Sequence, residues 1–231
     1  MALKKLPFRN VCVLLKHHLS TEEDVKTAAL IRELRNARLR GYLTRAELEK
    51  VCRWKSPRAI RLIRHNSVAR VRAATRRALA TRSERLRLEA LRTLDGVSVP
   101  MASAILTLLD PRRYGVIDIR VWQLLYALGE VTKKSSGVGF NYNNWYQFLM
   151  KLRYFAKKLR VSARDIERSL FFAHQANQKG TLYQRPPQKS HWNTISQIAR
   201  YSRSHDAVIR VYDEAGNVIA THEHKGDFKE P

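Results

Sequence analysis

The sequence predicts a mainly α-helical protein with a small C-terminal β-hairpin. Between about residues 21 and 173, apolar residues recur at the three- and four-residue spacing of amphipathic helices. Several of these stretches begin with a Ser or Thr that is followed three residues later by an acidic residue, which is a helix-start signature. Near the C-terminus, apolar and polar residues alternate as they do in a β-strand. We therefore expect a helical domain at 1–174, a linker at 175–192 and a small module with the β-hairpin at 193–231.

Short helices are expected to fill the first hundred residues. The segment from Ser20 to Glu23 looks like a capped start, and Thr44 to Glu47 begins a second helix. Ser56-Pro57 begins a third helix, because proline is tolerated in the first helical turn. Residues 68–79 then continue the apolar pattern with arginines on the remaining faces.

Two longer helices are expected in the second half of the domain. Residues 133–144 (KKSSGVGFNYNN) form a polar loop that contains glycine, and an amphipathic helix follows at 145–159. Ser162 to Asp165 begins one more helix, which runs to Phe172. The residues from His174 to Ser190 are rich in Gln, Lys and Pro, which favours a linker.

The C-terminal module differs from the helical domain in pattern and in charge. Residues 207–212 and 218–222 alternate around 213–217, which predicts the β-hairpin. From residue 205 onward, three basic residues accompany six acidic residues. His222 and His224 would share a strand face, so metal binding is conceivable, but a solvent-facing strand is favoured because no further ligand spacing supports a site. The sequence identifies no protein partner for this module.

The charge balance indicates a polyanionic partner. The 231 residues include 44 Lys and Arg against 20 Asp and Glu, which gives a formal net charge of +24. Nucleic acid is the commonest partner of so basic a protein, with DNA favoured and RNA left open, and an anionic membrane surface is the other candidate. Twelve arginines but only two carboxylates lie between residues 53 and 92, which favours a surface that contacts a polyanion.

The apolar runs and the cysteines limit the compartment. No apolar run is long enough for a membrane-spanning helix, so we expect a cytoplasmic protein of the bacterial cytosol or nucleoid that does not associate with membranes. Cys12 and Cys52 are too few for a four-cysteine zinc site or a cysteine-ligated iron–sulfur cluster from this chain alone. Ordinary buried thiols in a reducing compartment are the favoured interpretation.

A glycine turn between two helices is the most informative local motif. In the run Leu94-Asp95-Gly96-Val97-Ser98-Val99-Pro100, Gly96 allows a positive φ or the close approach of a ligand, because it lacks a Cβ. The helix expected at 101–109 presents unpaired N–H groups at its N-terminus, and such groups bind phosphate. The predicted DNA contacts here are Gly96, Val97, Ser98 and Val99. An ordinary helical turn that happens to contain glycine is the alternative.

This region resembles the core of the helix-hairpin-helix DNA glycosylases of the endonuclease III type. The resemblance covers residues 53–128, most clearly 88–122. Leu94, Gly96, Val97 and Ala102 fall on the hairpin pattern of that family, and Val116-Ile117-Asp118 matches its second signature. The resemblance implies a glycosylase-like helical bundle and removal of a damaged or modified base from DNA. It also implies a structural potassium or sodium ion on the backbone carbonyls of Leu94 and Val97, with no other cofactor required.

Asp118 is the catalytic candidate. Cleavage of an N-glycosidic bond builds positive charge on the deoxyribose, and a nearby carboxylate stabilises that charge and orients or deprotonates an attacking water. Asp118 also stands where the next helix begins, so it is expected to be the N-cap. A cap without any catalytic role is the alternative interpretation, although in the family that it resembles the two roles coincide.

The lysine pattern predicts a monofunctional enzyme. Pro100 stands where bifunctional members of the family carry a nucleophilic lysine, so this chain resembles a divergent member, and residues 56–132 contain no lysine. A Schiff base needs an amine, so strand cleavage by the usual lysine is not expected. Lys55, Lys133 and Lys134 remain available from outside the motif, but nothing in the sequence marks them as activated.

A glycosylase must also stack its flipped base and hold the DNA backbone. The aromatic candidates for the base pocket are Trp54, Trp122, Tyr142 and Trp145, although a core position is the favoured interpretation of each. Arg58, Arg112, Arg113 and Arg120 are candidate phosphate contacts, with simple solvation as the alternative. The sequence thus favours hydrolytic base excision. A non-catalytic DNA- or RNA-binding protein is the main alternative, and a basic scaffold in a nucleoprotein or defence complex is a third.

Overall fold

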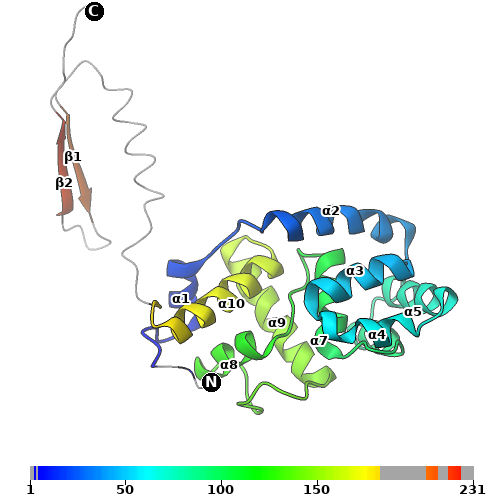
Figure 1. Ribbon diagram of the computed structural model, residues 1–231. Coiled ribbons are helices and arrows are strands. Elements are labelled where there is room, and N and C mark those ends of the chain that lie inside the picture. Colours follow the sequence, from blue (N-terminus) through cyan, green and yellow to red (C-terminus); the bar gives the residue numbers. More distant parts are fainter. Residues whose placement is uncertain (1–2, 4, 183–206, 213–217, 225–231) are drawn as a thin grey trace, which may run out of the picture. The chain divides into compact units, whose positions relative to one another are not determined.

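The computed structural model describes residue 3, residues 5–182, and two strand segments at 207–212 and 218–224. Two compact units are present, one at 1–184 and the other at 185–231, and each is described by itself. The described part of the first unit is mainly helical, which confirms the predicted mainly α-helical class (Figure 1). Its elements are α1 (Val11–His18), α2 (Val25–Arg40), α3 (Arg45–Lys55), η1 (Pro57–Ala59), α4 (Ile60–Arg64), α5 (Val68–Ala80), α6 (Glu84–Arg92), α7 (Val99–Leu109), α8 (Ile119–Ala127), α9 (Tyr142–Leu159) and α10 (Ala163–Lys179).

Helix α7 is at the centre of the helical unit. It is buried along nearly its whole length because its sequence, VPMASAILTLL, carries no charged residue. It packs against α2, α3, α6 and α9 (Figure 1). Helix α10 packs against α1, α8 and α9 and forms a second group. Helix α9 also contacts α6 and α7, so it joins the two groups.

Two predicted capping boxes are confirmed, and one predicted helix start is wrong. Thr44 with Glu47, and Ser162 with Asp165, form capping boxes at the starts of α3 and α10. The predicted start at Ser20 to Glu23 is wrong, because α2 begins at Val25 and the side chain of Asp24 accepts the N–H of Thr27 at 2.9 Å. Residues 21–24 lie outside any helix, and Glu23 is bound by arginines of α10, a tertiary contact that outweighs the local signal.

Other helix boundaries also differ from the expectation. Helix α9 begins at Tyr142, three residues before the predicted start, because the side chain of Asn141 caps it. Helix α10 continues to Lys179 and ends at Gly180, five residues into the segment predicted as a linker. Helix α1 was not predicted. It is too short to be stable alone, and burial of its apolar face, with α10 as a neighbour, stabilises it.

The second unit contains a pair of antiparallel strands. Strand β1 (Ala207–Tyr212) pairs with β2 (Val218–His224), with Ala207 opposite His224 and an irregularity between Val211 and Tyr212. The connecting residues 213–217, the remaining residues of 183–231 and the strand side chains lie outside the described residues. The hairpin turn and the candidate metal ligands His222 and His224 therefore stay predictions.

The described residues of the helical unit include two free thiols and no membrane-spanning helix. Within the described residues, no helix combines the length and the apolar content that crossing a bilayer requires. Cys52 is buried and Cys12 is half-buried, and both are free. Over the same residues, no group of three or more His, Cys, Asp or Glu side chains comes together as a metal site would require.

Candidate functional site

The glycine motif forms a tight turn between α6 and α7. The N–H of Val97 donates to the carbonyl of Leu94 at 3.2 Å, and Gly96 has φ +77°. A positive φ at the third of four residues, after a second residue with negative φ, is the signature of a type II turn. The predicted glycine turn between two helices is therefore present, with α7 beginning at Val99 and Ser98 as its N-cap.

The turn is fixed to the preceding helices by a buried side chain. The amide of Asn66, fully buried after α4, donates to the carbonyl of Asp95 at 3.0 Å and accepts the N–H of Asp95 at 2.9 Å. Arg70 adds an ion pair to the Asp95 carboxylate at 3.0 Å. Both hydrogen-bonding groups of the Asp95 peptide are thus occupied, which holds the turn rigid.

Gly96 is required by packing as well as by its backbone conformation. A Cβ there would lie 3.0 Å from the Cβ of Leu62 and 3.3 Å from the backbone N of Ile63. We expect Gly41→Ala, at φ +81° with open space around it, to cost about 1–2 kcal/mol of unfolding free energy. Gly96→Ala should cost a further ~1–3 kcal/mol, because neighbouring backbone must shift. Urea unfolding of the two variants measures the difference, and equal costs would show that the contact with α4 is not restrictive.

The turn leaves backbone donors available beside exposed arginines. Within the described residues, the N–H groups of Gly96, Ser98 and Val99 have no acceptor. Arg58 on η1 and Arg61 on α4 are exposed, and neither pairs with a described carboxylate. Gly96 packs directly on η1 and α4, the two elements that carry these arginines.

The loop before α8 is held in place on both of its sides. The hydroxyl of Ser103 on α7 accepts the N–H of Ile117 at 3.1 Å and donates to the carbonyl of Pro100 at 2.8 Å. On the other side, the loop passes so close to α9 and α10 that a Cβ on Gly115 would lie 2.4 Å from Leu152. These contacts fix the position of Asp118, which follows Ile117 directly.

Asp118 caps α8 and forms an ion pair. Its Oδ1 accepts the N–H of Arg120 at 3.0 Å, as the sequence predicted for an N-cap. Its Oδ2 lies 3.0 Å from the Nζ of Lys55, the last residue of α3. The side chains of Asp118 and Lys55 are 24% and 19% exposed, so both are partly shielded yet remain accessible.

Asp118 and Lys55 line a pocket of about 600 Å³, a size typical of small-molecule sites. Its wall comes from four segments that are distant in sequence, with residues within 23–27, 54–55, 116–120 and 164–172. The pocket therefore lies where the α2 and α3 side of the unit meets α8 and α10. Its lining has equal numbers of acidic and basic side chains, so it carries no net charge that would select an anion.

Aromatic rings supply the apolar part of the pocket. Trp54 is fixed by a 2.8 Å hydrogen bond from its Nε1 to Thr27, and the guanidinium of Arg164 lies 5.5 Å from its ring centre. Phe171 and Phe172 of α10 line the same pocket. Flat apolar surfaces together with a few polar groups suit a planar heterocycle.

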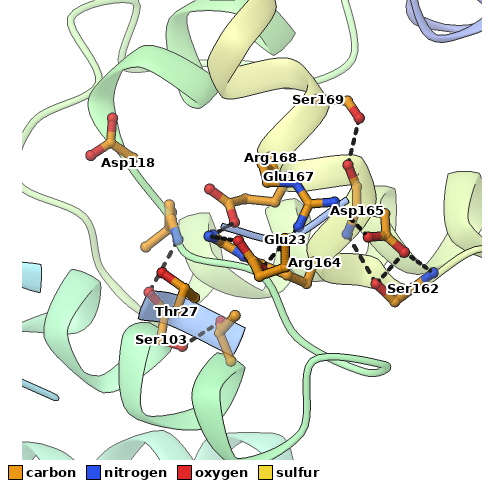
Figure 2. A network of polar contacts seen from close by, with 12 residues as sticks. Glu23, Thr27, Ser103, Asp118, Ser162, Arg164, Asp165, Glu167, Arg168 and Ser169 are labelled. Atoms are coloured by element: carbon orange, nitrogen blue, oxygen red, sulfur yellow. Dashed lines mark hydrogen bonds and ion pairs between the residues drawn. The ribbon is translucent and has the colours of Figure 1, made fainter. Parts of the chain in front are cut away.

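A buried ionic network supports the floor of the site (Figure 2). Glu23 accepts Arg164 at 2.8 Å and Arg168 at 2.9 Å, and Arg164 also pairs with Glu167. Burial raises the pKa of Glu23, but its hydrogen bonds and charge interactions with Arg164 and Arg168 outweigh burial and hold that pKa below its usual value. Burial raises the pKa of Glu167. Figure 2 shows Asp118 apart from this network, so Asp118 is not part of the structural cluster.

The prediction of base stacking is wrong for two of the four candidate residues. Trp122 and Trp145 are fully buried in the core, so neither can stack on a base unless the core opens. They occupy the core because exposure of so large an apolar ring to water would cost much free energy. Tyr142 is half-buried beneath Arg85, 4.2 Å from its ring centre, and does not line the pocket. Trp54 does line it.

The predicted phosphate-binding arginines are separated from one another. Arg120 lines the pocket beside Asp118, and Arg58 lies on η1, the element that Gly96 contacts through Ala59. Arg113 instead pairs with Glu84 at 3.0 Å. The exposed Arg112 lines a different hollow, with Thr21 and residues 160–165. The structure therefore unites Arg120 and Trp54 with Asp118, but not Arg112 or Arg113.

Sequence reasoning missed most of the pocket. Arg164, Arg168 and Phe171 lie three or four residues apart and therefore share one face of α10. Charged residues that are followed on the same helix face by an aromatic residue are a sequence signal that could have indicated the pocket. No local signal marked Lys55, because its partner Asp118 is 63 residues away.

Comparison of the chain with protein-family models, with curated protein sequences and with solved structures returned no significant match.

Proposed function

We propose that this protein is a DNA glycosylase that hydrolyses the N-glycosidic bond of a damaged or modified base, in a helix-hairpin-helix glycosylase-like fold. The observation that carries the proposal is a partly shielded carboxylate, Asp118, at the wall of a 600 Å³ pocket that also contains Trp54, Phe171 and Phe172. A pocket with balanced charge suits an uncharged base, whereas the unpaired arginines near the turn suit the backbone.

In this mechanism the base is turned out of the helix and enters the pocket, where Trp54 and Phe171 offer stacking surfaces. As the base leaves, the Asp118 carboxylate stabilises the positive charge on the sugar and orients an attacking water. The helix-terminal N–H of Arg120 holds one carboxylate oxygen in place, and Ser103 fixes the preceding loop.

The glycine turn would bind the DNA backbone. The available N–H groups of Ser98 and Val99 point to a phosphate site at the N-terminus of α7, with Arg58 and Arg61 adjacent. The carbonyl of Leu94 accepts one hydrogen bond and that of Val97 accepts none within the described residues, so both retain lone pairs for the structural potassium or sodium ion. We assign the activity to the bacterial cytoplasm, where such a basic protein meets the nucleoid.

Base release tests the proposal directly. Duplexes that each carry one uracil, hypoxanthine, 8-oxoguanine, alkylated purine or mismatch are incubated with the full chain and then treated with hot alkali, which cuts at abasic sites. Alkali-labile product on at least one duplex is expected. Binding across the whole panel without product would contradict the proposal and favour the alternative, a non-catalytic DNA- or RNA-binding protein.

The dependence of binding on salt tests the DNA surface. The logarithm of the affinity falls with the logarithm of salt concentration by about 0.9 per neutralised phosphate. We expect replacement of both Arg58 and Arg61 by alanine to reduce that slope by about 2, with a similar effect on different sequences. Arg35→Ala, at an exposed arginine on α2, is the matched control and should leave the slope unchanged. Equal slopes in all three proteins would contradict this surface.

A further inference from the structure

The pocket contains an amine that the sequence gave no reason to place there. Lys55 ends α3 and lies 3.0 Å from Asp118, and both side chains line the pocket. Among the lysines of the described residues, Lys55 is the one that lines this pocket. Trp54 and Glu167 line the same pocket, and the side chain of Lys55 is 19% exposed, so the amine is partly shielded from solvent.

We propose that Lys55 is a second catalytic residue, which forms a covalent imine with the aldehyde of the abasic site and thereby cleaves the DNA strand. This inference rests on the proposed function and adds a step to it. It replaces the expectation of a monofunctional enzyme, which rested on Pro100 in the place of the lysine, on the absence of lysine from residues 56–132 and on the lack of any sequence signal at Lys55.

The first step conserves atoms and charge. The Lys55 ammonium passes a proton to the Asp118 carboxylate, and the neutral amine adds to C1′ of the ring-opened sugar. Asp118 returns the proton to the resulting hydroxyl, which leaves as water, so an N–C bond replaces the C–O bond and a protonated imine remains. The 3.0 Å contact between Nζ and Oδ2 is the distance that this proton transfer needs.

The second step breaks the strand without any oxidant or reductant. The Asp118 carboxylate removes a proton from C2′, the electron pair of that bond forms the C2′–C3′ double bond, and the C3′–O bond breaks. The 3′ phosphate leaves with the electron pair of the broken bond. Water then hydrolyses the imine, which releases the unsaturated sugar aldehyde and restores the Lys55 amine.

Borohydride trapping tests the assignment. The full chain is mixed with a duplex that carries one preformed aldehydic abasic site, and sodium borohydride reduces any imine to a stable secondary amine. We expect a protein–DNA adduct on a denaturing gel, and peptide mapping should place it on Lys55. A duplex with a tetrahydrofuran site, which has no aldehyde, is the matched substrate control and should give no adduct.

Two variants test whether the adduct requires the amine of Lys55 itself, rather than its positive charge or any lysine of α3. Lys55→Arg keeps a cation beside Asp118 but has no nucleophilic amine, so the adduct should be lost while the melting temperature is retained. Lys50→Ala removes an exposed lysine from the same helix, where it pairs with Glu33, and should leave the adduct unchanged.

Each outcome has a distinct meaning. An adduct on Lys55 supports the inference, including the case in which no base in the panel is released, which would contradict only the proposed function. Base release without any adduct overturns the inference and leaves the proposed function standing. An adduct that persists in Lys55→Arg or maps to another residue overturns the assignment. Absence of any binding to either duplex overturns both.

Discussion

Replacing Asp118 by asparagine is expected to lower the rate of base release by about 100- to 10,000-fold, the range for loss of a positioned acid–base group. Asparagine keeps the side-chain oxygen that accepts the N–H of Arg120, and it is as good an N-cap as aspartate. The variant should therefore fold and bind DNA with little change. It loses the negative charge that stabilises the sugar cation in the transition state, and it also loses the ion pair with Lys55.

A second aspartate of the same pocket is the matched control. Asp24 also lines the pocket and also caps a helix, where it accepts the N–H of Thr27 at 2.9 Å. We expect Asp24→Asn to retain base release within a few-fold, measured on the same duplex with the same alkali treatment. A similar loss in both variants would mean that the charge of the pocket as a whole matters, and full activity of Asp118→Asn would remove the mechanism.

Replacing Glu84 by glutamine is expected to produce a large loss of stability, about 1.5–3 kcal/mol, because it removes the anion from a partly buried ionic cluster. Glu84 pairs with Arg87 at 2.9 Å, Arg113 at 3.0 Å and Arg153 at 2.7 Å, and it accepts the hydroxyl of Tyr114 at 2.8 Å. It thereby joins α6, the loop before α8 and α9. Without its charge, three guanidinium groups would face one another without an anion.

The matched control lies on the same helix. Glu89 is an exposed residue of α6 that is 3.6 Å from Arg85. Because exposed ion pairs of this kind contribute about 0.3–0.5 kcal/mol, Glu89→Gln should change stability very little. Thermal and urea unfolding of both variants give the comparison. Equal losses would show that the cluster around Glu84 contributes no more than a surface pair.

The same residue predicts the acid sensitivity of the fold. Burial by itself raises the pKa of Glu84, but hydrogen bonds from Arg153 and Tyr114 and the charge of Arg153 hold it below the ordinary value of 4.5. The pKa is therefore lower in the folded than in the unfolded protein, so the contribution of Glu84 is complete above pH 4.5 and is lost as pH falls through the folded pKa. Glu84→Gln should unfold with a weaker dependence on pH in that range.

Local signals were sufficient wherever a single stretch of chain decides the outcome. The capping residues Thr44 and Ser162 begin helices as expected, since a cap is formed within four residues. Gly96 adopts the positive φ that a glycine turn allows, and Asp118 caps α8 for the same local reason. The apolar run of α7 likewise predicts its burial, because it offers no polar face to solvent.

Signals of this kind failed where contacts distant in sequence outweigh a local preference. Helix α2 begins only at Val25, after its N-cap Asp24, because Glu23 binds arginines 141 and 145 residues further along the chain. Trp122 and Trp145 were candidates for base stacking although a core position was the favoured interpretation of each, and only the packing shows that both are buried. A side chain can be assigned to a pocket or to a core only once its neighbours are known.

The sequence by itself therefore determined the helical class, the glycine turn, the capping role of Asp118 and the surplus of positive charge. Only the tertiary structure decided what surrounds Asp118. It placed Lys55 at 3.0 Å, set Trp54 and Phe171 in the same pocket, and turned Arg113 toward Glu84. The physical reason is that caps and turns are formed by neighbours in the chain, whereas a pocket is formed by the packing of helices that the sequence keeps far apart.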